Sequence, residues 1–170
     1  FALQRRRVGV PGDLIAIESP TFYAGLQASE RLGLKVIEIP SHPRDGVSLA
    51  ALEDALRHHP VKACLFMLNF ANPSGSLLSD ERKKALLELL YRYDVPLIED
   101  DVYAELYFGR QAPLCTKAAD PAGLVMHVSS FSKCLAPGYR LGWVAAGRYA
   151  NRVRRLKLST SLATTVPVQI

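Results

Sequence analysis

The sequence of 170 residues contains few cysteines, a single tryptophan and no long hydrophobic run. Its three cysteines, Cys64, Cys115 and Cys134, form no C-x-x-C pair, so neither a disulfide framework nor a zinc site is indicated. The longest apolar stretch, 61–68, is interrupted by Lys62 and is far shorter than the ~20 residues that cross a bilayer. We therefore expect no membrane span and a reducing, cytoplasmic setting.

The composition is that of an ordinary globular protein. Apolar residues make up 49% and charged residues 22%, which excludes a disordered or coiled-coil chain, and the length fits one domain. The net charge is +5, and the basic residues cluster only at an Arg-rich helical end, Arg5–Arg7, and at 152–157. We interpret both clusters as solvated helix faces rather than as nucleic-acid sites.

Short β-rich runs alternate with amphipathic stretches, which is the pattern of βαβ units and a mostly parallel sheet. In two helices the apolar residues fall on one face after a capping serine. One begins after an N-cap at Ser48. The other begins after an N-cap at Ser79 and has Asp80 and Glu81 in its first turn. The expected strands are 14–18, 35–39, 62–68, 96–99, 124–129 and 141–146. We therefore predict an α/β fold without an internal domain boundary.

Three of these strands end in unusual polar or glycine-containing sequences, at 69–75, 99–103 and 129–133. Ligands of open α/β sheets bind beyond the carboxyl ends of the strands. If the strands are parallel neighbours, an amide, a carboxylate, a phenol and a lysine converge on one crevice.

A lysine in a loop is usually just exposed to solvent, but Lys133 has notable neighbours. It follows Ser130 and Ser132 and precedes Arg140, a combination that suits a phosphate held beside a reactive amine. Residues 130–133 also match the S-x-x-K motif of serine acyltransferases. That alternative expects S-D-N and K-T-G motifs, and neither occurs in the sequence, so it ranks below the phosphate interpretation.

Three adjacent acidic residues, Glu99, Asp100 and Asp101, either face water or bind a metal ion. Strand alternation sends Glu99 and Asp101 to one side and Asp100 to the other, so the three do not form one cage. We expect the histidines in polar loops, at helix ends or, for His127, in a strand or the core, where none assists the carboxylates. The sequence therefore predicts no metal site.

Three ordered motifs resemble those of the fold-type-I enzymes that depend on pyridoxal 5'-phosphate (PLP), the aminotransferase class I/II superfamily. They are N-P-x-G at 72–75, D-x-x-Y at 100–103, and S-x-S-K at 130–133 followed by Arg140. More narrowly, stretches such as L-A-P-G-Y-R-L-G-W at 135–143 look like the aminotransferase-like domain of MocR/GntR-type transcriptional regulators. The resemblance covers essentially the whole chain. It implies a mostly parallel sheet with helices on both faces.

The resemblance implies PLP as the cofactor and assigns its reactive contacts. Lys133 would form the Schiff base with the cofactor and act as the proton shuttle. Asp100 would keep the pyridine nitrogen protonated, which makes the ring an electron sink. Tyr103 and Asn72 would donate hydrogen bonds to the ring oxygen O3'.

The resemblance also assigns the remaining cofactor contacts. Ser130, Ser132 and Arg140 would hold the phosphate, with bidentate geometry from the guanidinium. Phe22 is the best match for the aromatic side chain that stacks on the ring, and Tyr23 is its competitor.

The chain begins at Phe1 rather than at Met, and we interpret residues 1–170 as a fragment of the large domain of a fold-type-I transferase. By resemblance, the family's phosphate loop and any winged-helix DNA-binding domain would lie upstream, and the small domain with its substrate-binding arginine downstream. A homodimer is implied for the full-length protein, because fold-type-I sites form between subunits. The fragment alone is then a half-site whose ability to hold PLP is open.

Two functions follow from the resemblance. The first is the effector domain of a regulator that senses PLP or a small amino compound and passes the change to a DNA-binding module. The alternative is a freestanding aminotransferase that moves an amino group between an amino acid and a 2-oxo acid. Both use the same chemistry at Lys133, so this stretch of sequence does not separate them.

Overall fold

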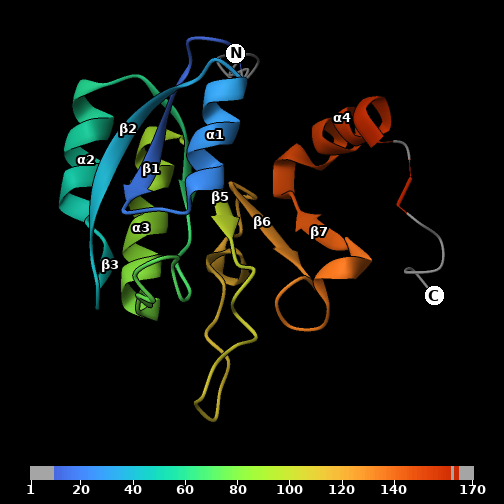
Figure 1. The fold of residues 1–170 in the computed structure, drawn as a ribbon. Coiled ribbons are helices and arrows are strands. Elements are labelled where there is room, and N and C mark those ends of the chain that lie inside the picture. The colour runs from blue at the N-terminus through green and yellow to red at the C-terminus, as the bar shows by residue number, and fades with distance from the viewer. Residues whose placement is uncertain (1–9, 162, 165–170) are drawn as a thin grey trace.

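The computed structural model describes residues 10–161 and 163–164, and its centre is a seven-stranded sheet (Figure 1). The basic cluster Arg5–Arg7 lies outside the described residues. The strands are β1 (Leu14–Ser19), β2 (Lys35–His42), β3 (Gly46–Val47), β4 (Val61–Phe66), β5 (Leu97–Asp100), β6 (Val125–Ser130) and β7 (Gly142–Ala145). The helices are α1 (Tyr23–Arg31), α2 (Leu49–His58), α3 (Asp80–Tyr93) and α4 (Ala150–Ser161).

The strand order is β3-β2-β1-β4-β5-β6-β7, with parallel pairing from β2 through β6. Only the two edge strands, β3 and β7, pair antiparallel. The mostly parallel sheet is thus confirmed, and each of the six expected strands is present with ends shifted by at most a few residues. β3 was not predicted, because a strand of two residues shows no periodicity.

The two predicted helix starts are confirmed by their caps. The Ser48 hydroxyl accepts a hydrogen bond from the amide of Ala51, and the Ser79 hydroxyl accepts one from the amide of Arg82. α3 ends where Asp94 adopts a left-handed conformation with φ 51°.

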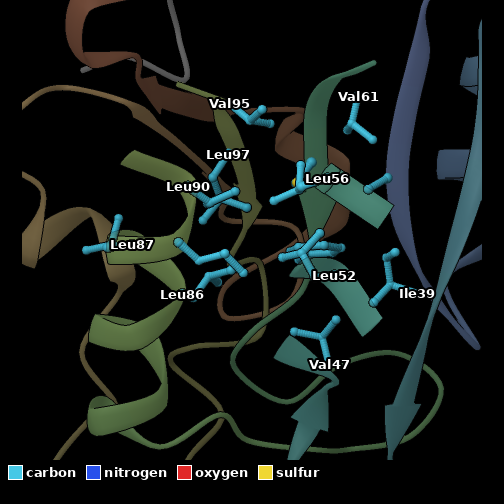
Figure 2. Close-up of a cluster of buried hydrophobic side chains, with 14 of the residues drawn as sticks. Ile39, Val47, Leu52, Leu56, Val61, Leu86, Leu87, Leu90, Val95 and Leu97 are labelled. Carbon is cyan, nitrogen blue, oxygen red and sulfur yellow. The ribbon is translucent and has the colours of Figure 1, made fainter. Parts of the chain in front are cut away.

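Helices cover both faces of the sheet, as expected. α2 and α3 pack on one face, where leucines of both helices contact valine, leucine and phenylalanine side chains of the strands (Figure 2). α1 and α4 lie over the other face, with an apolar cavity of about 580 Å³ between them and the sheet. The larger core is therefore on the α2/α3 face, and it holds the strands whose carboxyl ends carry the candidate site.

The second basic cluster lies on α4, where Arg154, Arg155 and Lys157 are exposed. This exposure agrees with a solvated helix face, and the expectation that the cluster is not a nucleic-acid site stays a prediction. Among residues 10–161, no helix combines the length and the apolar character required to span a bilayer.

Candidate functional site

The predicted site residues follow the carboxyl ends of four adjacent parallel strands. Phe22 follows β1, Asn72 follows β4, Asp100 ends β5 with Tyr103 just beyond it, and the loop after β6 carries residues 130–140. Parallel neighbours end at the same edge of the sheet, so the fold gathers these segments on one side of the molecule.

Tyr103 connects two of the predicted residues. Asn72 Nδ2 donates a hydrogen bond of 3.2 Å to the Tyr103 hydroxyl oxygen, and the Lys133 amine lies 5.9 Å from the centre of the Tyr103 ring. Lys133 is exposed, whereas Asn72 and Tyr103 are partly buried. An amine, a phenol and an amide drawn from three loops therefore form one group.

The hydroxyls of the β6 loop form a second group with a guanidinium. The Ser130 hydroxyl accepts a hydrogen bond from the Ser132 amide at 3.3 Å. Arg140 Nη1 lies 3.5 Å from the Ser132 hydroxyl oxygen and donates to the Pro137 carbonyl at 3.3 Å. Two hydroxyl oxygens and an exposed cation in one loop are suited to binding an oxyanion.

Backbone geometry fixes this loop where it enters β7. Arg140 has a φ of 49°, a left-handed conformation that is uncommon for a residue with a side chain. Gly142 lies in β7, and a Cβ at this position would come within 2.8 Å of the Ser129 carbonyl oxygen. Glycine therefore permits the close antiparallel pairing of β7 with β6.

Asp100 lines a small pocket at the same sheet edge. Glu18, Thr21 and Phe22 also line this pocket, which does not include the Tyr103 group or the β6 loop. Phe22 is 37% exposed and lines this pocket, whereas Tyr23 is 64% exposed and does not line it. The structure thus brings Phe22 to Asp100. Lys133 and Arg140 are not among the lining residues.

Burial raises the pKa of the Asp100 carboxyl above its ordinary value, and the neighbouring Asp101 adds to the effect. Glu18 is only 3% exposed, and its Oε1 accepts a hydrogen bond of 2.7 Å from the Met67 amide. Burial raises the pKa of Glu18 to about 8, with a further contribution from Asp100. Sequence reasoning missed Glu18, because a single acidic residue at a strand end carries no distinguishing pattern.

We expect Glu18→Gln to remove a pH dependence of stability. The pKa of Glu18 rises from 4.5 to about 8 on folding, so its favourable contribution is complete below pH 4.5 and is lost as the pH rises to 8. At pH 9 the free energy of unfolding of the variant is expected to exceed that of the wild type by up to about 5 kcal/mol. Urea unfolding of the full-length protein at pH 5, 7 and 9 measures this difference.

Glu88→Gln, at an exposed position of α3, is the matched control and is expected to keep the wild-type pH profile. Parallel pH profiles of Glu18→Gln and the wild type would show that Glu18 ionises in the folded protein as it does in the unfolded chain.

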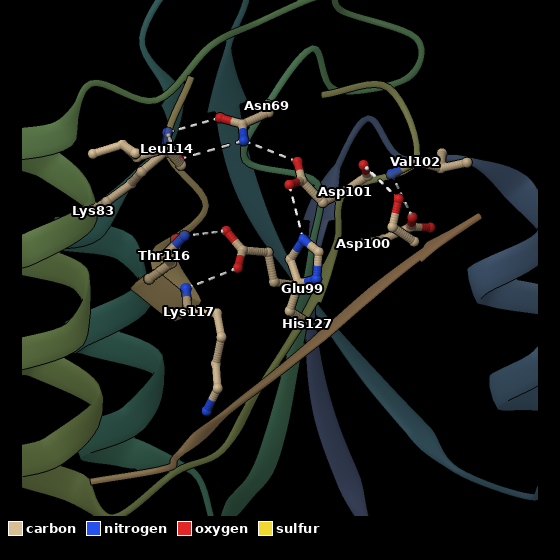
Figure 3. A network of polar contacts seen from close by, with 11 residues as sticks. Asn69, Lys83, Glu99, Asp100, Asp101, Val102, Leu114, Thr116, Lys117 and His127 are labelled. Atoms are coloured by element: carbon tan, nitrogen blue, oxygen red, sulfur yellow. Dashed lines mark hydrogen bonds and ion pairs between the residues drawn. The ribbon is translucent and has the colours of Figure 1, made fainter. Parts of the chain in front are cut away.

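The predicted alternation of the three acidic residues agrees with the contacts. Glu99 is buried and accepts hydrogen bonds from the amides of Thr116 and Lys117, at 2.6 and 3.1 Å. Asp101 is buried beside His127, with 2.9 Å between Oδ2 and Nε2 (Figure 3). Asp100 lines the pocket with Phe22 instead.

The expectation that no histidine assists the carboxylates was wrong for His127. It lies in β6 as expected, but β6 pairs with β5 and brings its ring to Asp101. Glu99, Cys115 and His127 also place potential ligand atoms within 4.8 Å of one another. Both Glu99 oxygens accept amide hydrogen bonds and His127 contacts Asp101, so two of the three side chains already have protein partners.

A family model for aminotransferase class I and II matches residues 7–167. The chain is 51% identical over 168 residues to YdcR, an uncharacterized HTH-type transcriptional regulator of Escherichia coli K12. The match covers 99% of this chain and 36% of the regulator, so the chain spans about a third of that relative's length.

Solved structures of aminotransferases are similar to this chain in fold. The kynurenine aminotransferase of Pyrococcus horikoshii, solved in complex with PMP, superposes with a TM-score of 0.88 at 36% identity, over 94% of this chain and 41% of that one. The α-aminoadipate aminotransferase LysN of Thermus thermophilus, complexed with N-(5'-phosphopyridoxyl)-L-leucine, superposes with a TM-score of 0.88 at 27% identity. That match covers 94% of this chain and 42% of LysN.

Proposed function

Because this chain belongs to the aminotransferase class I and II family, we propose that it is part of a PLP-binding large domain that serves as the effector domain of an HTH-type transcriptional regulator. The observation that carries the proposal is the grouping of Lys133 with Tyr103 and Asn72, at the sheet edge where Asp100 and Arg140 also lie. The regulator role draws on the 51% identity to YdcR.

The residues at the sheet edge fit the chemistry of PLP. Asp100 offers a partly buried carboxyl for a pyridine nitrogen, and Phe22, in the same pocket, offers an aromatic face. Asn72 and Tyr103 offer hydrogen bonds to a phenolic oxygen, and Lys133 offers an amine to an aldehyde.

The phosphate position has its own donors. Ser130, Ser132 and Arg140 form a connected group, and the guanidinium presents several N–H donors in a fork that matches a phosphate. Each functional group of the cofactor therefore has a complementary residue in the chain.

PLP, when bound, supplies an aldehyde that reacts with amines and a ring that withdraws electrons from the attached amino compound. Asp100 would hold a proton on the pyridine nitrogen, and Tyr103 and Asn72 would orient the ring. Lys133 would supply the amine that holds the cofactor aldehyde and, when its Nζ is free, would accept and return a proton at that atom. Arg140 and the two serines neutralise and anchor the phosphate.

In this function a small amino compound would bind at the site and change the contacts of Lys133 at the sheet edge. We propose that a DNA-binding domain elsewhere in the full-length protein reads this change, that the protein is cytoplasmic, and that it works as a homodimer. A second candidate function is amino-group transfer between an amino acid and a 2-oxo acid. It is favoured by the 36% identity and the TM-score of 0.88 to the kynurenine aminotransferase.

We expect PLP, with or without an amino acid, to change DNA binding by the full-length protein. The measurement is fluorescence anisotropy with DNA from the protein's own promoter region, at fixed salt because salt alone shifts affinity. Lys133→Ala is the matched control and is expected to lose the amino-acid response while keeping basal DNA binding. Rapid transamination by a protein that never binds DNA would instead establish the second function.

A further inference from the structure

A chain of polar contacts runs behind the candidate site, on the α3 face of the sheet (Figure 3). The Lys83 amine of α3 donates to Asn69 Oδ1 and to the Leu114 carbonyl, both at 2.7 Å. Asn69 Nδ2 donates to Asp101 Oδ1 at 2.8 Å, and Asp101 Oδ2 lies 2.9 Å from His127 Nε2. Both oxygens of the Asp101 carboxyl are therefore held by side chains.

This network is deeply buried. Lys83 is 3% exposed, Asn69 0% and Asp101 4%, and His127 is partly buried. Buried polar and charged groups persist only when they are paired, because their desolvation is costly. Each of these four side chains meets that condition through the others, so removing one leaves another unpaired in the core.

The backbone of Asp101 is held as firmly as its side chain. Its amide donates to the Val128 carbonyl at 2.9 Å, and its carbonyl accepts from the Ser129 hydroxyl at 3.1 Å. Asp100 precedes it and lines the pocket on the opposite side of the strand, so a shift of the backbone at Asp101 also moves the Asp100 carboxyl. Tyr103 follows two residues later, in the turn that the hydrogen bond from the Ala104 amide to the Asp101 carbonyl closes.

We propose that Asn69, Lys83 and His127 are positioning residues for the candidate cofactor site, which act through Asp101 to fix the direction of the Asp100 carboxyl and of Tyr103. This inference rests on the proposed function. None of the three was singled out from the sequence as part of a cofactor site.

The charged groups of this network also affect the pKa of Asp100. The hydrogen bond to Asp101 raises the pKa of His127, and Glu99 and Asp100 add to the rise. In turn, Asp101 raises and His127 lowers the pKa of Asp100. Cys115 also lies beside Glu99 and His127, and on the same face Asn69 binds to Asp101 and Lys83 binds to Asn69. A protonated His127 therefore favours the Asp100 carboxylate that a pyridinium requires.

The test is PLP affinity of the full-length protein across pH, by absorbance titration, for His127→Gln and His127→Leu. The glutamine keeps an N–H donor toward Asp101 but carries no charge. It is expected to match the wild type above the pKa of His127, which NMR measures on the same protein, and to bind PLP more weakly below it. The leucine removes the donor and is expected to weaken PLP binding about tenfold at every pH, because a hydrogen bond to the charged Asp101 is lost.

Tyr91→Phe is the matched control, because it removes a 2.7 Å hydrogen bond to Asp120 in the same layer without touching Asp101. It is expected to bind PLP like the wild type. Unchanged affinity in both His127 variants, with the wild type binding PLP, would overturn the positioning role alone. Absence of PLP binding by the wild type would overturn the proposed function and this inference together. If His127→Leu does not fold, the pH profile of His127→Gln decides.

Discussion

Replacing Lys133 with alanine is expected to abolish covalent attachment of PLP to the full-length protein. After borohydride reduction, peptide mass spectrometry is expected to find the pyridoxyl label on Lys133 of the wild type and on no lysine of the variant. The physical reason is that Lys133 is the amine next to Tyr103 and Asn72, at the sheet edge that holds the other cofactor contacts. The loss is complete rather than partial, because no other group replaces the nucleophile.

Two controls sharpen this experiment. Lys133→Arg keeps the cation but not the nucleophilic amine, so it is expected to retain reversible PLP binding without the label. Lys84→Ala, at an exposed position of α3, is expected to label like the wild type. Labelling of a different lysine in the wild type would contradict the assignment of Lys133.

Asp100→Asn is expected to weaken PLP binding by about 10- to 100-fold, because a hydrogen bond to a charged group contributes ~1.5–3 kcal/mol. The stability of the protein without cofactor is expected to stay equal or to increase. Burial already disfavours the Asp100 carboxylate, and the neutral amide avoids this cost. Absorbance titration measures the affinity, and urea unfolding measures the stability.

The pH dependence separates this role from a general loss of structure. The pKa of Asp100 is raised, so wild-type affinity is expected to fall as the pH is lowered through that pKa and the carboxylate is protonated. Asp100→Asn is expected to lack this decrease, and the exposed Glu88→Gln to keep it. Wild-type affinity in Asp100→Asn at neutral pH would remove Asp100 from the site.

Most of the fold could be predicted from the sequence because its signals are local. The caps at Ser48 and Ser79 and the six alternating strands need only neighbouring residues, and the structure confirms them. β3 could not be predicted, because its two residues gain strand structure only by pairing with the end of β2. The antiparallel direction of β7 likewise depends on its pairing with β6.

The candidate site likewise has residues that the sequence predicted and residues that it did not. The motif residues Asn72, Asp100 and Lys133 were selected from short patterns of sequence, and the fold places them after neighbouring strands. The partner of Asp101 was not expected, because the His127 ring comes from a residue 26 positions away in the chain. Glu18 was missed for a similar reason, since its amide partner, Met67, lies 49 positions away.

The sequence by itself determined the element types, the mostly parallel sheet and the motif residues that follow its strands, because these depend on local spacing and hydrophobic period. Only the tertiary structure decided which side chains meet behind and beside those motifs. Burial and contact between distant residues set the charge of Glu18, the pairing of Asp101 with His127 and the direction of Asp100. Such long-range contacts exist only once the strands are side by side, so no short window of residues contains them.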